Sequence, residues 1–262
     1  MYEDTIESFS QSAVKKAQSV RKDILRYFIL SMLAGIYVGF GIMLIFSIGA
    51  PFAHANSPAV KILMGVSFGI ALTLVIIAGA ELCTGNNMVM VIGNMTGKSS
   101  ISDTAIVWIV SLAGNLAGSL LFSFLCVQTG LFKNIVLQEF INGAATTKMN
   151  APLTELFVRG ILCNMLVCLA IWMSARVKDD TARILVIFWC LFAFIASGFE
   201  HSVANMSLLG FPLLSGDHAG ISWYGYFRNI GIVVLGNIVG GSVMIGAAYA
   251  FVSAEKDKLE GK

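Results

Sequence analysis

Six long stretches with almost no charged side chains dominate this sequence. Each is close to the ~20 residues that an α-helix needs to cross the hydrocarbon core of a bilayer. They are residues 27–50, 62–80, 104–132, 153–175, 184–199 and 229–254. Of the 262 residues 57% are hydrophobic and only 12% charged, whereas about a quarter are charged in a typical soluble domain. The sequence therefore predicts an all-α integral membrane protein with six transmembrane helices and excludes a compact soluble fold.

Charge and cysteine content exclude several other classes. The formal net charge of +2 gives no reason to expect a nucleic-acid partner. The five cysteines form no Cys-x-x-Cys pair and lie mostly within apolar runs, so neither a disulfide framework nor a zinc site is indicated. We expect no cofactor and no metal.

The distribution of Lys and Arg predicts the orientation, because basic residues stay preferentially on the cytoplasmic side. With six spans both termini share one face, and that face collects twelve Lys and Arg residues against five on the other. We therefore expect both termini in the cytoplasm of a bacterium, with the protein in its inner membrane. The organisation would be an amphipathic helix over 1–26, a channel domain over 27–254 and a tail over 255–262. The apolar face of the first helix would lie in the lipid headgroups or pack on a neighbouring subunit.

An internal repeat divides the channel domain at about 27–132 and 153–254. Glu81 and Glu200 are each followed five residues later by an asparagine, Asn86 and Asn205. A Gly-Asn-apolar-x-Gly core also occurs in both halves, at 114–118 and 236–240. An odd number of helices in each unit would place the two units in opposite orientations, which is the inverted-repeat plan of transport proteins. Spans one and four show no match.

The second and fifth spans are expected to be broken, because apolar residues resume after Glu81 and Glu200. Irregular backbone at membrane depth survives only where protein buries it or water lines it. Half-helices that start near Thr84 and Ser202 would direct positive dipole ends at the break, which suits an anion. An ordinary loop with a re-entrant turn after Glu81 is the alternative.

Few polar side chains are available to carry chemistry inside the membrane. His201 is the only histidine expected there, and opposite Thr84 it could attract an anion, lend it a proton, or simply join two helices. Lys148 could draw anions into an outer vestibule or be an ordinary loop lysine. Glu81 and Glu200 are expected to be structural, paired with broken backbone or with a cation such as Lys148 or Arg159. Asn164 could be a polar neighbour of His201 or could bond one helix to another.

Several motifs together resemble the formate/nitrite transporter family over nearly the whole chain. They are Glu81-Leu82-Cys83-Thr84-Gly85-Asn86, Gly114-Asn115-x-x-Gly118, Arg159-Gly160 with Asn164, Gly198-Phe199-Glu200-His201-Ser202-Val203-Ala204-Asn205-Met206, and Gly236-Asn237-x-x-Gly240-Gly241. The resemblance is closest to the hydrosulfide channel branch.

The resemblance implies a homopentamer with an aquaporin-like pore in each protomer. It assigns the central histidine to His201, the loop threonine to Thr84, the outer lysine to Lys148, coupled to Glu200 and Asn205, and the neighbouring asparagine to Asn164. It places apolar constrictions at Phe68, Leu72, Leu82 and Phe194.

We therefore expect a channel for small monovalent anions, with hydrosulfide favoured over formate and nitrite and with permeation assisted by His201. Hydrogen sulfide is the weakest of the three acids, so a proton is lent most easily to its anion. A neutral-solute channel of the aquaporin type is one alternative, but its Asn-Pro-Ala signature would require a proline that neither break contains. A membrane enzyme is the other, and the sequence offers no clustered metal ligands for it.

Overall fold

The computed structural model describes residues 2–216 and 219–259, and within these residues the chain is entirely helical. Six segments are long and apolar enough to cross a membrane, as the sequence predicts. They are α2 (Ile24–His54), the run α3 to η1 (Val60–Gly79), α6 (Ile101–Gln128), α8 (Leu153–Arg176), α9 (Asp180–Ser197) and the run from α11 into α12 (Trp223–Ala254).

Local capping moves several boundaries away from the predicted ones. The third span ends at Gln128 rather than at 132, because the chain turns at Gly130, whose φ of 77° suits glycine. The fifth span begins at Asp180 rather than at 184, where the Asp179 side chain caps the helix. The sixth begins at Trp223 rather than at 229, and Ser222 caps it. A criterion based on the absence of charge misses these polar caps.

Two half-helices complete the bundle. The second span is built from α3 (Val60–Ser67), α4 (Gly69–Thr73) and η1 (Leu74–Gly79), and after an extended break it continues as α5 (Cys83–Met95). The fifth span, α9, continues after its own break as α10 (Ser202–Ser215). Both predicted breaks are therefore present, and helices resume after them instead of an ordinary loop.

The helices form a ring with the half-helices on its inside. Around the ring, α6 packs on α2, α2 on α3 and α4, these on α9, α9 on α8, and α8 on α11. The half-helix α10 packs on α6, and α5 packs on η3 (Val239–Ala247), the continuation of α11 (Trp223–Ile238). Helix axes approach closely at small residues: a Cβ added at Gly118 would lie 2.0 Å from the Met32 carbonyl oxygen.

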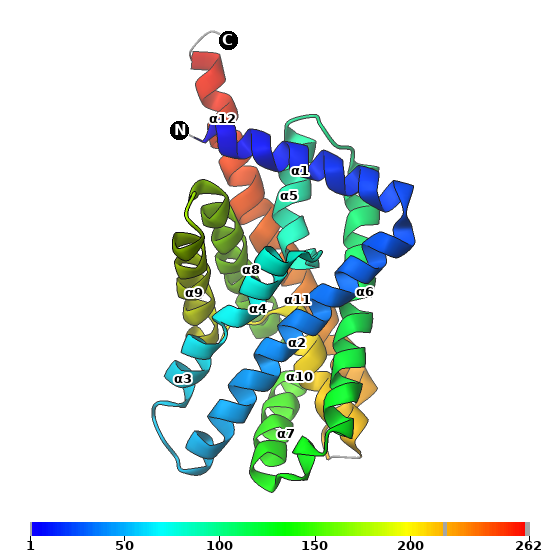
Figure 1. The fold of residues 1–262 in the computed structure, drawn as a ribbon, viewed down its shortest axis with the longest axis vertical. Coiled ribbons are helices and arrows are strands. Elements are labelled where there is room, and N and C mark those ends of the chain that lie inside the picture. The colour runs from blue at the N-terminus through cyan, green and yellow to red at the C-terminus, as the bar shows by residue number, and fades with distance from the viewer. Residues whose placement is uncertain (1, 217–218, 260–262) are drawn as a thin grey trace.

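The described ends of the chain lie at the same end of the bundle, where α1 (Glu3–Lys22) runs across the helices (Figure 1). At the opposite end lies α7 (Ile135–Asn150), a helix that the sequence analysis did not predict, preceded by the short η2 (Leu131–Lys133). The expected tail over 255–262 begins inside α12 (Ala248–Leu259), and residues 260–262 lie outside the described part.

The apolar face of α1 packs on its own protomer, chiefly on α5 and α6. Phe9 stacks on Trp172 with ring centroids 5.6 Å apart, and Ala13 and Val20 are buried in the same cluster. The ion pair of Glu7 with Lys98 adds a polar tether. Helix α1 is thus part of the protomer's core on that side.

Candidate functional site

The first break is held open by one asparagine side chain. Asn115 on α6 accepts a hydrogen bond from the Cys83 N–H through Oδ1, at 2.9 Å. Its Nδ2 donates to the carbonyl oxygens of Ser31, at 2.7 Å, and of Glu81, at 2.9 Å. Asn115 is fully buried. A single side chain therefore bonds three backbone groups, and two of them, the Cys83 N–H and the Glu81 carbonyl oxygen, belong to the break and would otherwise be costly at membrane depth.

The second break repeats this arrangement. Asn237 Oδ1 accepts from the Ser202 N–H at 2.9 Å, and its Nδ2 donates to the carbonyl oxygens of Gly160, at 2.8 Å, and Glu200, at 3.0 Å. The turn into the break uses Gly198, whose φ is 77°. The two Gly-Asn motifs found in the sequence are thus the same structural device used twice.

The backbone extends the repeat to spans one and four, where the sequence shows no match. The Glu81 N–H donates to the Leu30 carbonyl oxygen, and the Glu200 N–H to that of Arg159, both at 3.2 Å. These bonds use main-chain atoms and leave the side chains free to differ, so sequence comparison could not detect them.

Each break also carries a buried or half-buried carboxylate with a lysine. Glu200 accepts from Lys148 Nζ and from Asn205 Nδ2, both at 2.6 Å. The Lys148 side chain is 23% exposed and that of Glu200 only 3%. An approaching anion therefore meets the ammonium before the carboxylate. Arg159, the other predicted cation, pairs instead with Glu155.

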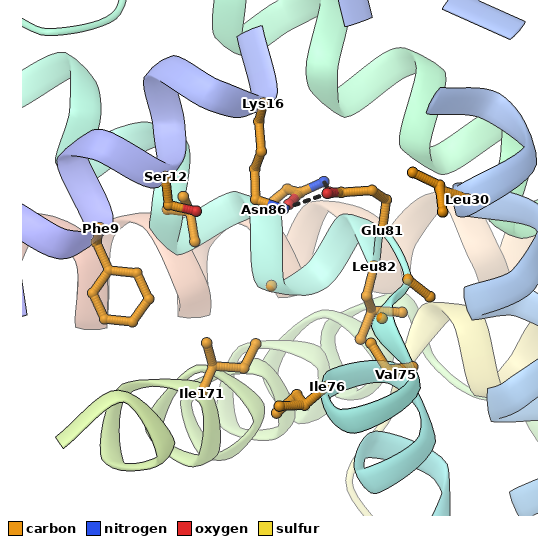
Figure 2. A pocket seen from close by; sticks show the side chains of 14 residues that line it. Phe9, Ser12, Lys16, Leu30, Val75, Ile76, Glu81, Leu82, Asn86 and Ile171 are labelled. Carbon is orange, nitrogen blue, oxygen red and sulfur yellow. Dashed lines mark hydrogen bonds and ion pairs between the residues drawn. The ribbon is translucent and has the colours of Figure 1, made fainter. Parts of the chain in front are cut away.

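The first break has its lysine on a different element. Lys16 of α1 donates to Glu81 Oε2 at 2.5 Å, and Asn86 Nδ2 lies 3.4 Å from the same oxygen (Figure 2). Tyr27 Oη also donates to this oxygen, at 2.8 Å. The sequence analysis missed both Lys16 and Tyr27. The sequence offered one indication for Lys16. It follows the apolar Ala13 by three residues, which places it at the edge of the apolar stripe of α1.

His201 and Thr84 meet where the two breaks face each other. His201 is the N-cap residue of α10, and its Nδ1 accepts a hydrogen bond from the Ala204 N–H at 3.1 Å. Its Nε2 lies 3.0 Å from Thr84 Oγ1. A neutral ring whose Nδ1 accepts carries its proton on Nε2. That proton is donated to Thr84, which leaves the threonine hydroxyl hydrogen free for another acceptor.

Asn164 does not join this pair by a hydrogen bond. Its Nδ2 donates to the carbonyl oxygens of Thr84, at 3.1 Å, and Asn237, at 2.6 Å. It is fully buried on α8. Asn164 thus ties the start of α5 to α11, and among its hydrogen bonds to described residues it is linked to the histidine only through Thr84.

A narrow apolar neck surrounds His201. Its void has a volume of about 10 Å³ and is lined by the four expected constriction residues together with His201, namely Phe68, Leu72, Leu82 and Phe194. A cavity needs roughly 10–15 Å³ on this measure to hold one water molecule. The neck therefore has room for at most about one water molecule.

A wider cavity lies on each side of the neck. The cavity at the α1 end has a volume of about 530 Å³, and Lys16, Glu81 and Leu82 line it (Figure 2). The cavity at the α7 end, lined by Lys148 and Asn205, has a volume of about 140 Å³. His201 and Phe194 line both this cavity and the neck. Two vestibules with a lysine each thus lead to one narrow constriction.

Metal chemistry has no support in the described part of the chain, where no three His, Cys, Asp or Glu side chains gather so as to hold an ion. The five cysteines are buried and free.

Comparison with known proteins gives consistent results. Residues 3–251 match the family model for the formate/nitrite transporter. The chain is 39% identical to the nitrite transporter NirC of Salmonella typhimurium, over 98% of this chain and 94% of that protein. It is 37% identical to a probable formate transporter of Methanothermobacter thermautotrophicus, over 84% and 86% of the two chains.

Solved structures agree with this match. A chain described as an FNT family ion channel superimposes with a TM-score of 0.91 at 40% identity, covering 95% of this chain and 99% of that one. A pentameric formate channel with formate bound superimposes with a TM-score of 0.75 at 28% identity, covering 87% and 97%.

Proposed function

The chain belongs to the formate/nitrite transporter family, and on this premise we propose that it conducts small monovalent anions, with hydrosulfide as the favoured cargo. It is a multi-pass membrane transporter and not an enzyme. The observation that carries the proposal is the pair of Thr84 and His201 at a narrow neck between two lysine-bearing vestibules. We further propose a homopentamer in the inner membrane of a bacterium, with one pore per protomer and both termini in the cytoplasm.

Capture of the anion is electrostatic. Lys148 is more exposed than Glu200, so the outer vestibule presents positive charge although the pair is neutral overall. The N-terminal ends of α5 and α10 face the break and add positive potential. Both effects favour anions over cations as the ion approaches the neck.

The neck forces the anion to shed its water, because a void of about 10 Å³ has no room for a hydration shell. A bare anion in an apolar constriction is costly unless it is hydrogen-bonded or neutralised. The hydroxyl of Thr84 is the donor that the geometry supplies, and His201 Nε2–H supports it from behind.

Protonation of the anion is the second way to reduce this cost. The ring of His201 gains a second proton only at Nδ1, which breaks its bond to the Ala204 N–H. The proposed first step is therefore hydrogen-bond donation by Thr84. A proton follows only to the most basic cargo: His201 takes up a proton at Nδ1 and gives its Nε2 proton to the Thr84 oxygen as the Thr84 hydroxyl proton passes to the anion, which leaves a neutral ring and a neutral acid. Hydrosulfide is the most basic of the three anions considered, which is why we favour it; nitrite and formate are the anions named for relatives.

The test is flux of hydrosulfide, formate and nitrite in proteoliposomes that contain one preparation of the protein, compared across pH. We expect all three to pass, hydrosulfide fastest, and each to be faster at acid pH. Flux of formate or nitrite well above that of hydrosulfide would overturn the assignment of cargo. A flux of neutral solutes that exceeds all anion fluxes would overturn the channel class.

A further inference from the structure

A further cavity reaches the meeting point of the half-helices from the side opposite to the neck. It has a volume of about 180 Å³, lies between α6 and α11, and is separate from both vestibules. We call it the lateral crevice. The neck is lined by residues of α2, α4, α8 and α9, whereas the crevice is lined from α5, α6, α10 and α11.

The mouth of the crevice is apolar. Ile109 of α6 is 67% exposed, and Leu112, Val234 and Ile238 are partly exposed beside it. A charged solute would lose its hydration on entering past these side chains and would gain no partner in return. Only an uncharged molecule is suited to this route.

The floor of the crevice is polar and incompletely bonded. The Ser202 hydroxyl is fully buried and has no hydrogen-bond partner in the described part of the chain. No hydrogen bond is found for the Asn87 side-chain amide among the described residues either, although Asn87 is only 5% exposed. Buried polar groups are almost always paired, so the unpaired hydroxyl of Ser202, beside an Asn87 amide that lines the same cavity, points to a site for a hydrogen-bonding ligand.

The crevice is also placed where it adjoins the proposed permeation step. Thr84, whose hydroxyl bonds His201 on the pathway side, also lines the crevice. Both α6 and α11 belong to candidate membrane spans, so the exposed mouth of the crevice between them lies at membrane depth.

We propose that the lateral crevice is a binding site for a small uncharged molecule with both a hydrogen-bond donor and an acceptor, such as the conjugate acid of the transported anion, arriving from the bilayer. The amide of Asn87 and the hydroxyl of Ser202 would bond it, and the apolar mouth would exclude the anion itself. The identity of the ligand rests on the proposed function; the existence of the site does not.

Cys83 provides a reporter, because it is in the crevice and 6% exposed, whereas Cys163 and Cys168 are fully buried elsewhere. In proteoliposomes, uncharged methyl methanethiosulfonate should label Cys83 about tenfold faster than Cys163 or Cys168, since the latter need local opening. Peptide mass spectrometry gives all three rates in the unmodified protein. Equal rates would overturn the proposal.

Competition identifies the ligand class. Formamide, an uncharged stand-in for formic acid, should slow labelling of Cys83 at least about threefold at concentrations a few times its dissociation constant, whereas sodium formate should not. Asn87→Leu should remove the protection by formamide and keep the labelling. Protection by formate as well, or by neither compound, would overturn the proposal; the latter would mean that the crevice holds only water or an acyl chain.

The route is tested by filling the mouth. Ile109→Trp should abolish rapid labelling of Cys83, and the matched control Leu125→Trp, at another exposed position of α6 (53%), should not. Unchanged labelling in Ile109→Trp, with the oligomer intact by gel filtration, would contradict lateral entry. Anion flux of the wild-type protein, measured in the same vesicles, separates the proposed function from the proposed binding site. Protection by formamide without anion flux would contradict the proposed function and would still support the binding site.

Discussion

The two breaks use the same scaffold and differ in their chemistry. Asn115 and Asn237 each bond three backbone groups, and each break has a glutamate bonded to a lysine. The two breaks differ at the residue that precedes each half-helix. Leu82 precedes α5 and offers no side-chain cap, whereas His201 caps α10. One repeat thus supplies an apolar gate and the other supplies the ionisable ring.

The lysines also differ in attachment. Lys148 is on α7, next to the vestibule of about 140 Å³, and Lys16 is on α1, beside the vestibule of about 530 Å³. Tyr27 gives Glu81 a further hydrogen bond. The asparagines that bond the backbone at each break are shared between the halves and are structural. The N-cap residues and the lysines differ between the halves, and we expect them to control transport.

The largest effect should come from the shared scaffold. Asn115→Ala and Asn237→Ala each leave two backbone groups of a break without this partner, at a cost on the order of 2 kcal/mol or more. We expect both variants to lose most of their folded oligomer, to a similar extent, in a thermal-stability assay. A large loss in one variant and none in the other would show that the two breaks are not equivalent.

His201→Phe should abolish or sharply reduce anion flux while the oligomer stays assembled, because the ring donor is lost but the volume is filled. Leu82→Met is the matched change at the other half-helix, and as a volume-conserving swap it should leave flux nearly unchanged. Wild-type flux in His201→Phe would reduce the histidine to a helix cap.

The lysines should have smaller, salt-sensitive effects. Removing Lys148 alone would leave Glu200 as a buried unpaired charge, so the paired change Lys148→Met with Glu200→Gln is the cleaner test. We expect a loss of roughly 2- to 10-fold at low ionic strength that shrinks in high salt, as for other steering charges. The pair Lys16→Met with Glu81→Gln should lose less, because lysine and glutamate are equally exposed there, at 18% each. The same loss at all salt concentrations would contradict capture by charge.

The smallest effect concerns the tether of α1. A hydrogen bond from Gln11 and the ammonium of Lys98 lower the pKa of Glu7. The contribution of this ion pair is thus present at neutral pH and is lost as pH falls through the lowered pKa. Glu7→Gln should slightly speed hydrogen exchange in α1 at pH 7. The difference from wild type should vanish in acid, and a difference that persists there would point to another cause.

The sequence predicted most of the fold because apolar span length and the internal repeat both depend on the types of side chain along the chain. The six spans follow from apolar length, and both breaks follow from polar motifs inside those runs. The sequence analysis did not identify Lys16 and Tyr27 because their partner Glu81 is remote in the chain, at separations of 65 and 54 residues. Helix α7 was not predicted because its apolar pattern is weak and only Asn134 marks its start.

Some assignments needed coordinates for a different reason. Asn164 was expected either beside His201 or in a bond between helices. Its bonds run to main-chain oxygens of Thr84 on α5 and Asn237 on α11, and no residue pattern reveals these partners. The pore roles of Phe68, Leu72, Leu82 and Phe194 remain proposals, although all four line the neck.

Flux through Thr84→Val in proteoliposomes is the most direct measurement. This change keeps the shape of the side chain and removes the only hydroxyl that faces His201 Nε2 among the described residues. We predict a loss of hydrosulfide, formate and nitrite flux of about tenfold or more, corresponding to roughly 1.4 kcal/mol or more at the barrier, with the oligomer intact. Wild-type flux in this variant would contradict the claim that the Thr84–His201 pair receives the anion at the neck.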